Sequence, residues 1–486
     1  MKNSIFGLET EYGAYPVKRQ TNKPINMEAF SVKIDEYLKE LIQYLIKNNF
    51  LENGARFYVD TGQHPELATP ECSLVDDGVR YTRACNEILY SMKLPLEDKF
   101  KKNGLDIKIT FRADNKAYAV PDASIYTTYG AHENYLMKRE LYKNLFRNEN
   151  NSLKYLLSFL ATRVIYTGSG AIFMPNANEN PPKPYGFVIS PRAFFTECEV
   201  GTATTNQRPM ANQRDEAHAD PEEFARLHIL CGETNRSDWS NWLKIGTTAL
   251  VVAILNNKPR ILNGLPLTED GQNLASFRNI SKARDPNREN FYYQGEQRMS
   301  PVKFQRLLLE RVGEYVSQMP TREEENRIVE AWAKVLVMLE NNDPKLDKML
   351  DWKIKEKIMT KYAERKNIKA ERMHDWDLAQ IDIKYHDLGP NGLFEILEKE
   401  GAIERICTDE EIIDAMISPP KTTRALIRGN AIKFANQLEI MIRADWEFVN
   451  LYNIEYPLLN PFATHDQRLE DFIRMTLMEK LKKSPH

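Results

Sequence analysis

The 486-residue sequence has little of what marks secreted, disulfide-bonded or membrane-spanning proteins. Its five cysteines are an odd number and form no CxxC pair, so neither a disulfide framework nor a zinc knuckle is expected. The longest apolar stretches, such as 247–255, fall far short of the roughly 20 residues that cross a bilayer. The N-terminal segment lacks the apolar core of a signal peptide. We therefore expect a cytoplasmic protein with no membrane partner.

Neither sign of charge is in excess. The 66 basic and 69 acidic residues leave a formal net charge of −3, which gives no overall attraction to nucleic acid. The chain is also long enough to bury a substantial core without disulfides. No nucleic-acid partner is expected.

Two common catalytic signatures are missing. There is no Walker A phosphate loop, and a turn explains the glycines of 167–170 at least as well as a phosphate site does. His132-Glu133 does not begin the zinc motif HExxH, because position 136 is leucine. Any phosphate would then be held by metal, backbone amides or arginines, for which the candidates are Arg56, Arg208 and Arg214.

Two predicted strands carry polar groups on one face. In the segment 5–11, Glu9 and Glu11 alternate with apolar residues that can pack on a core. In 55–60 the side chains of Arg56, Tyr58 and Asp60 share the face opposite Phe57. Each strand therefore presents reactive groups away from the core.

If these strands are neighbours, several carboxylates converge, and the set is Glu9, Glu11, Asp60, Glu66 and Glu71. Like charges in one cleft repel one another, a cost that a divalent cation removes. Magnesium prefers such oxygen ligands together with nucleotide phosphates. A solvated strand face explains the alternation equally well, but the density of functional groups over 56–71 favours a magnesium site.

The remaining pattern predicts an α+β protein, with antiparallel strands followed by many helices. A further strand is expected at 106–111, and 265–297 is expected to be a polar surface excursion. Asp220 is expected to cap a helix ahead of Pro221. Helices are predicted over 27–49, 76–92, 133–146, 221–231, 243–255, 302–318, 322–340 and 346–362, and loops over 115–130 and 175–184. A break near 418–420 separates a domain of residues 1–415 from a small C-terminal domain of residues 416–486.

At these motifs the chain resembles the Pup ligase family and its sister family of Pup deamidases and depupylases. Both belong to the glutamine-synthetase-like carboxylate–amine ligase superfamily. The matching segments run nearly end to end and in order, at 7–13, 53–60, 64–66, 68–71, 129–136, 214–220, 226–228, 243–250, 422–425, 428–429 and 445–446.

The resemblance implies a glutamine-synthetase-like large domain, with a curved antiparallel sheet packed by helices, and a small C-terminal domain that contributes to the nucleotide site. It implies that ATP phosphorylates the C-terminal glutamate side chain of a small protein tag (Pup). A lysine of an acceptor protein then attacks to give an isopeptide bond, with a link to a proteasome pathway.

The same resemblance implies residue roles. Asp60 would deprotonate the incoming lysine, a role that fits the need of an ammonium for a base. ATP would contact Arg56, Thr69 and Trp446, although a lone tryptophan is more often a core residue. Magnesium would be held by Glu9, Tyr58 and Glu66, with Glu11 beside them. A phenol is a poor magnesium ligand, so the Tyr58 carbonyl or a bridging water are alternatives.

Three alternatives stay open. A deamidase would use Asp60 to attack an amide, but that branch carries a long insertion between the first glutamate motif and the aspartate strand, which this chain lacks. A ligase could instead join glutamate to a small amine or peptide, or the fold could be a silent binder. The segment 111–116, the loop after it, and Asn206, where the family has arginine, depart from the pattern and leave the tag and acceptor open.

Overall fold

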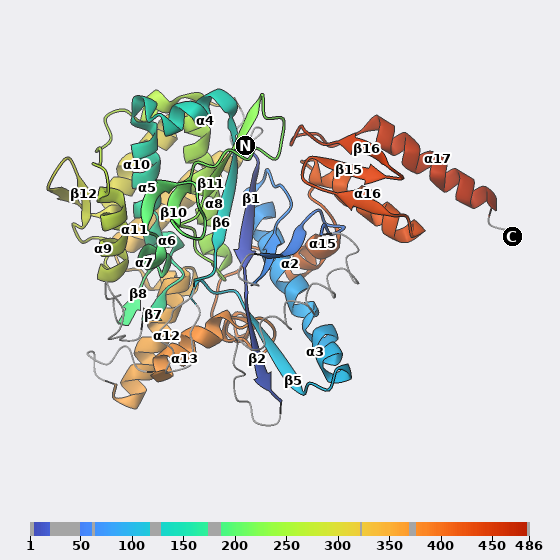
Figure 1. Cartoon of the computed structure of the whole chain (residues 1–486). Helices are drawn as coiled ribbons and strands as arrows, with labels where there is room; N and C mark the ends of the chain where they lie inside the picture. The colour runs from blue at the N-terminus through green and yellow to red at the C-terminus, as the bar shows by residue number, and fades with distance from the viewer. Residues whose placement is uncertain are drawn as a thin grey trace.

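The computed structural model describes residues 4–19, 49–60, 64–116, 128–173, 186–320, 323–368 and 376–483. Figure 1 shows a large body of helices around a sheet, with the C-terminal segment beside it. Apart from Asn49, the helix predicted over 27–49 lies outside the described residues. So does the loop predicted over 175–184.

One mixed, mostly antiparallel sheet organises the body. Its strand order is β3-β4-β1-β6-β11-β10-β9, and only β10 and β9 pair in parallel. The strands are β1 (Phe6–Glu11), β3 (Arg56–Asp60), β4 (His64–Ala68), β6 (Ala131–Lys138), β9 (Cys198–Gly201), β10 (Pro209–Asn212) and β11 (Phe224–Ile229). The two strands predicted from the sequence, β1 and β3, are far apart in the chain. In the sheet, β4 alone lies between them.

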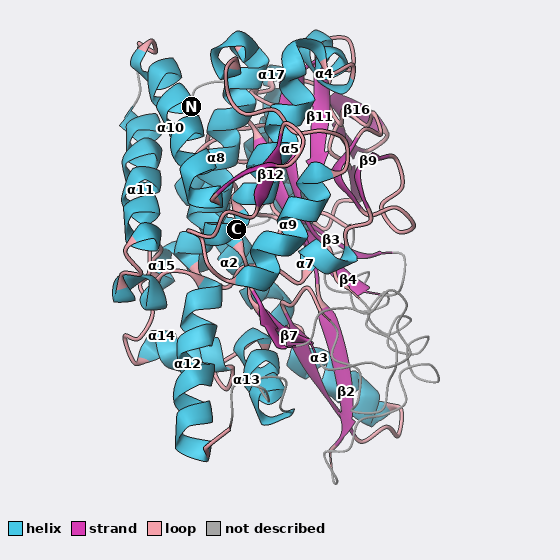
Figure 2. Ribbon diagram, turned by 90° about the vertical axis from the view of Figure 1, so that its left-hand side faces the viewer, coloured by secondary structure: helices cyan, strands magenta, loops and turns pink. Residues whose placement is uncertain are grey.

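Helices cover one face of this sheet (Figure 2). Phe6 and Leu8 of β1 are buried on that face, where α2 (Val75–Ser91) and α8 (Asp238–Asn257) pack. Gly78 lets α2 approach closely, since a Cβ there would lie 2.9 Å from both Phe6 and Ile245. Because the apolar face of β1 is buried in this way, Glu9 and Glu11 point to the other side of the sheet.

The other elements of the body frame this core. α8 is buried along nearly its whole length and also packs against α11 (Glu323–Glu340) and α10 (Pro301–Ser317). The remaining helices are α3 (Lys93–Lys102), α4 (Arg139–Phe146), α5 (Ser152–Thr162), α6 (Val164–Thr167), α7 (Arg192–Phe195), α9 (Gln272–Ala283), α12 (Asp351–Lys366), α13 (Trp376–His386), α14 (Leu393–Lys399) and α15 (Asp409–Ile417), with short 3-10 turns η1 (Glu149–Asn151), η2 (Pro259–Leu262) and η3 (Pro344–Lys348). Three two-stranded ribbons pair β2 (Gly13–Lys18) with β5 (Ile107–Arg112), β7 (Ala171–Phe173) with β8 (Gly186–Val188), and β12 (Phe291–Tyr293) with β13 (Gln297–Met299).

The C-terminal segment forms a lobe with an apolar cluster of its own. It contains α16 (Ala425–Leu438), a three-stranded sheet of β14 (Ile442–Ala444), β15 (Phe448–Leu451) and β16 (Ile454–Pro457), and α17 (Gln467–Lys483). Ile432, Val449 and Leu451 pack in this cluster together with Phe50 of the body. The mostly antiparallel sheet, the helices and this small lobe confirm the predicted α+β arrangement.

Two predicted helices are wrong because part or all of each segment pairs into the sheet as a strand. In 131–138 the buried residues alternate, so this stretch is β6 and only 139–146 is helical. Glu133, predicted as the first residue of a helix, is buried in β6 and paired with Arg163 of the segment joining α5 and α6. In 221–231 the strand β11 buries Ala225, Leu227 and Ile229.

Two further expectations change with these corrections. Asp220 caps no helix, and its Oδ1 instead accepts a hydrogen bond from the Glu222 N–H at 3.0 Å in a turn before β11. The segment 265–297 is not a surface excursion, because α9 lies within it and buries Phe277 and Ile280. Among the helices of the described residues, none has the length and apolarity needed to span a bilayer.

Candidate active site

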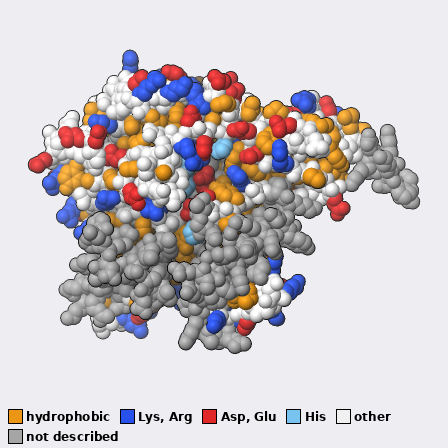
Figure 3. Space-filling view, viewed as in Figure 1, with side chains coloured by type: hydrophobic (Ala, Val, Ile, Leu, Met, Phe, Trp, Pro, Cys, Tyr) orange, Lys and Arg blue, Asp and Glu red, His pale blue; other side chains and the backbone are white. Residues whose placement is uncertain are grey.

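Three carboxylates converge on the sheet face that the helices leave uncovered. Antiparallel pairing sets Glu11 opposite Glu66 and Glu66 opposite Tyr58, across β1, β4 and β3. Oxygen atoms of Glu11, Asp60 and Glu66 all lie within 4.8 Å of one another. The convergence predicted from the two alternating strands is thus present for these three acids. In the space-filling view, acidic, basic and histidine side chains gather near the middle of this face (Figure 3).

The electrostatics of this cluster fit a cation. Burial, followed by the charges of Glu9, Glu11 and Asp60, raises the pKa of Glu66 well above its ordinary value. Burial and the nearby Glu9 and Glu66 also raise the pKa of the Tyr58 phenol, which therefore stays protonated at neutral pH. Closely spaced carboxylate oxygens that repel one another form the ligand set that magnesium prefers. Tyr58 faces this cluster from β3, opposite Glu66.

Glu9 lies in a second group, with two histidines that the sequence analysis left without a role. Its Oε2 lies 3.3 Å from His132 Nδ1 and 3.6 Å from His228 Nε2, and the three ligand atoms are within 4.8 Å of one another. Burial lowers the pKa of His228 to about 4, so its imidazole is neutral at pH 7. A carboxylate together with a neutral imidazole such as that of His228 can bind a divalent ion.

Polar neighbours on β6 and β11 keep Glu9 ionised. Asn134 Nδ2 donates to its Oε1 at 3.1 Å, and Arg226 Nη1 lies 3.6 Å from the same oxygen. Burial alone would raise the pKa of Glu9, but the contacts with His132 and His228 and the charge of Arg226 outweigh it and lower the pKa well below its usual range. Arg226 thus places a positive charge at this end of the site.

A cleft of about 570 Å³, open mouth included, runs from Glu9 toward the C-terminal lobe. Its walls come from β1, β4 and β6 on the body and from the lobe on the other side, and include Gly7, Glu9, Thr69, His218, Arg226 and Trp446. Thr69 Oγ1 accepts the Leu8 N–H at 3.0 Å, which ties the cleft floor to β1. The half-buried Trp446 borders this cleft, so its ring is not a purely core residue.

Arg56 lies near the same end. Its guanidinium stands 4.9 Å from the Tyr58 ring centroid and 5.6 Å from that of Phe50. The Phe50 ring in turn packs edge-on against Trp446, with centroids 4.9 Å apart. Three residues predicted to contact ATP, Arg56, Thr69 and Trp446, are thereby grouped around one end of the cleft.

Three other candidates lie outside the carboxylate cluster. Glu71 lines the cleft but is buried in ion pairs with Arg424 and Arg428. Arg208 pairs with Glu197 at 2.8 Å, and Arg214 pairs with Glu216 at 3.0 Å. Neither Arg208 nor Arg214 lines the cleft. Arg226 and His228 could have been found from their alternation in 224–229, had that segment been predicted as a strand.

The structure also locates the glycines of 167–170 and two of the residues that depart from the family pattern. Ser169 donates to buried Glu233 at 2.6 Å, and Gly170 has a φ of +68°, so 167–170 is a turn between α6 and β7. Asn206 lies in an exposed turn between β9 and β10. Lys116 is buried and donates to the Ile172 carbonyl at 2.6 Å. The loop at 117–127 lies outside the described residues.

Comparison with known proteins gives one consistent result. The family model described as Pup-ligase protein matches residues 4–450. A Pup–protein ligase of Corynebacterium glutamicum is 32% identical over 91% of this chain and 89% of its own length. One from Mycolicibacterium smegmatis is 30% identical over 97% of this chain and 99% of its own length.

Solved structures agree with these relatives. A crystal structure of the complex between the prokaryotic ubiquitin-like protein Pup and its ligase PafA matches with a TM-score of 0.83 and 28% identity, over 100% of this chain and 96% of that chain. A structure of PafA in complex with ADP matches with a TM-score of 0.77 and 29% identity, over 93% and 95% of the two chains.

Proposed function

The chain belongs to the Pup ligase family, and we propose that it joins a Pup-like protein tag to lysines of target proteins. The bond is an isopeptide between the side-chain carboxylate of the tag's C-terminal glutamate and the lysine amine. ATP supplies the energy, and magnesium is the accompanying ion. The deamidase and small-amine alternatives have no comparable support, because the relatives described above are named as Pup–protein ligases.

One observation carries this proposal: the carboxylate cluster lies beside the cleft. Glu9 lines the cleft and shares β1 with Glu11, whose oxygens meet those of Asp60 and Glu66. A nucleotide whose base lies near Trp446 would direct its phosphates toward these acids. Magnesium, when held by Glu9, Glu11 and Glu66, would spread the charge of the transferring phosphoryl group.

The chemistry divides into two transfers. An oxygen of the tag's glutamate attacks the γ-phosphorus of ATP, and the bond between that phosphorus and the bridging oxygen breaks. ADP departs, and the tag's glutamate now carries an acyl phosphate. The lysine nitrogen then attacks the acyl carbon, and inorganic phosphate departs. Because an ammonium is not a nucleophile, a base must first take its proton, and we assign this role to Asp60. Its carboxylate lies among the cluster oxygens, so it would stand beside an acyl phosphate that forms at this cluster.

The nucleotide site is shared between two parts of the chain. We assign contacts with ATP to Arg56 and Thr69 from the domain of residues 1–415 and to Trp446 from the domain of residues 416–486. The support is that Thr69 and Trp446 border one cleft, with Arg56 beside Phe50. The geometry favours Arg226 over Arg208 and Arg214 as the arginine at the phosphate end.

Incubation with ATP, magnesium, a Pup ending in glutamate and a lysine-bearing acceptor tests the proposal. We expect ADP release and an acceptor whose mass rises by that of the tag minus one water. Asp60→Asn should form no conjugate. Turnover of a ready-made conjugate without ATP consumption would indicate the deamidase, and ADP release only with a small amine would indicate the small-molecule ligase. No turnover of any kind would indicate a silent binder.

A further inference from the structure

Glu71 fixes the start of α16 to the catalytic sheet. Its Oε1 accepts from Arg424 Nε at 2.7 Å and from Arg428 Nη1 at 3.2 Å, and its Oε2 accepts from Arg428 Nη2. Thr423 Oγ1 donates to the Glu71 carbonyl at 2.7 Å. All four side chains, those of Glu71, Thr423, Arg424 and Arg428, are buried. The sequence motif of residues 422–429 therefore serves to hold the C-terminal lobe against the end of β4.

Arg428 in turn holds Trp446. Its guanidinium lies 4.9 Å from the ring centroids of both Trp446 and Phe50, and its Nη1 donates to the Trp446 carbonyl at 3.3 Å. Arg428 is fully buried and does not line the cleft, whereas Trp446 does. Because Glu71 also lines the cleft, Arg428 can act on a ligand there through the Trp446 ring that it supports or through Glu71.

Arg424 supports the neighbouring wall. Its Nη1 donates to the Leu458 carbonyl at 2.6 Å, its backbone N–H donates to the Pro461 carbonyl at 3.1 Å, and its Nη2 donates to the His218 carbonyl. Pro461 and His218 both line the cleft. One carboxylate, through two arginines, thus anchors the side of the cleft that is formed by the lobe.

We propose that Arg428, anchored by Glu71, is a positioning residue for the nucleotide because it fixes the Trp446 ring at the cleft wall. The inference rests on the proposed function, since it assumes that the ligand is an adenine nucleotide. A lysine at 428 keeps the charge but loses the planar fork that reaches Glu71 and the stacked contact with the rings. The pre-formed wall then becomes mobile, which weakens nucleotide binding more than it slows the chemical step.

The test compares wild type with Arg428→Lys. Calorimetry with magnesium and ADP should show a Kd raised about tenfold, and the KM for ATP should rise in parallel. The kcat at saturating ATP and the KM for the tag should change less than about twofold. In a Trp446→Ala background, Arg428→Lys should add less than about twofold, because residues that act as one unit are not additive.

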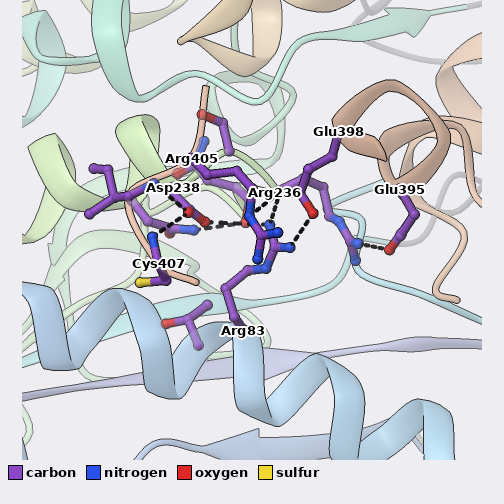
Figure 4. Close-up of polar contacts among 12 residues, drawn as sticks. Arg83, Arg236, Asp238, Glu395, Glu398, Arg405 and Cys407 are labelled. Atoms are coloured by element: carbon purple, nitrogen blue, oxygen red, sulfur yellow. Dashed lines mark hydrogen bonds and ion pairs between the residues drawn. The ribbon is translucent and has the colours of Figure 1, made fainter. Parts of the chain in front are cut away.

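A matched control separates positioning from general destabilisation. Arg83 of α2 is likewise buried and donates to Glu398 of α14 at 2.9 and 2.7 Å (Figure 4). Its guanidinium lies 5.2 Å from the Phe394 ring centroid. Neither Arg83 nor Glu398 lines the cleft. Arg83→Lys should lower thermal stability without raising the Kd for ADP.

The outcomes are distinguishable. Failure of the wild type to bind ADP would contradict the proposed function itself. If the wild type binds ADP and Arg428→Lys binds it with the same Kd, the positioning role alone is overturned. The same holds if the loss of affinity in Arg428→Lys simply adds to the loss in Trp446→Ala. If Arg428→Lys does not fold, Glu71→Gln replaces it, because it keeps both guanidiniums and an oxygen acceptor while weakening the anchor. Since Glu71 itself lines the cleft, a raised Kd supports the positioning role only if the effect disappears in the Trp446→Ala background, and an effect that persists there would overturn it.

Discussion

The carboxylate of Glu9 lies 3.3 Å from Nδ1 of His132, across the paired strands β1 and β6. This contact joins the first acidic strand to a strand that lies more than a hundred residues later in the sequence. It places the acid between the carboxylate cluster on one side and the cleft on the other. The consequences of that arrangement can be measured residue by residue.

Arg226 should matter more than Arg214. Arg226 donates to Asn134 at 2.9 Å and lies 3.6 Å from Glu9, while Arg214 is exposed and pairs with Glu216. We expect Arg226→Ala to lower kcat/KM for ATP by about 10- to 100-fold, the usual cost of losing a partner that orients a ligand group. Arg214→Ala should cost far less. Equal losses in steady-state assays would restore Arg214 as a phosphate-binding residue.

Glu66→Gln should change stability and activity in opposite directions. The substitution removes a buried negative charge that is repelled by Glu9, Glu11 and Asp60. Without added metal we expect the free energy of unfolding to rise by about 1 kcal/mol. The magnesium concentration for half-maximal activity should rise at least about tenfold, because a ligand oxygen is lost. Thermal denaturation in a chelator and a magnesium titration of ADP release measure the two effects. A less stable variant with unchanged magnesium dependence would argue against a metal at this cluster.

The ion pairs of Glu71 with Arg424 and Arg428 should make the stability of the protein depend on pH. Burial opposes its ionisation, but Arg428 and Arg424 prevail and lower its pKa from the ordinary 4.5 to about 2. A carboxyl whose pKa is lowered by folding contributes stability that is present above its unfolded pKa and is lost as the pH falls through the folded one. The contribution, on the order of 3 kcal/mol, should therefore fade between pH 4.5 and pH 2.

Thermal denaturation of wild type and Glu71→Gln across that range provides the check. We expect the wild type to be the more stable at pH 7, and the gap between the two proteins to close as the pH falls from about 5. A gap that stays constant would show that the carboxylate charge is not what the two arginines recognise.

The buried pair of Glu133 and Arg163 should be costly to break from one side. Both side chains are buried, and Arg163 Nη1 donates to Glu133 Oε2 at 3.0 Å. Glu133→Gln leaves the guanidinium charge uncompensated, so we expect a loss of about 3–5 kcal/mol. The double replacement Glu133→Gln with Arg163→Met should recover part of that loss. Denaturant titrations of the wild type and the two variants measure the loss and its recovery.

The sequence predicts some strands of the central sheet and misses others. Alternation placed Glu9, Glu11 and Asp60 on strand faces that the structure confirms, because their partners on the other face are apolar. β6 and β11 were missed because buried polar residues such as Glu133 and His228 break the apolar signal of a strand. These buried polar side chains interact with residues far away in the sequence, and a local sequence pattern cannot show such interactions.

The candidate site, too, could be predicted from the sequence only in part. Convergence of Glu11, Asp60 and Glu66 is predicted on the condition that the strands are neighbours, and the strand order meets that condition. β3 and β4 follow each other closely in the chain, but the pairing of β1 with β4 joins distant segments and could not be derived from local pattern. The separation of Glu71 from that cluster could not, because it depends on two arginines more than 350 positions later in the chain. The pairing of Glu9 with His132 and His228 likewise depends on long-range strand order.

The most direct test of the central claim is the fate of the acyl phosphate in Asp60→Asn. Wild type and variant are given ATP, saturating magnesium and a Pup ending in glutamate, with either a lysine-bearing acceptor or hydroxylamine. Hydroxylamine is a neutral nucleophile and needs no base to remove a proton before attack. We expect the variant to form the hydroxamate at a rate close to that of the wild type but to form almost no lysine conjugate. Conjugation at the wild-type rate, or loss of both products together, would contradict the assignment of Asp60 as the base.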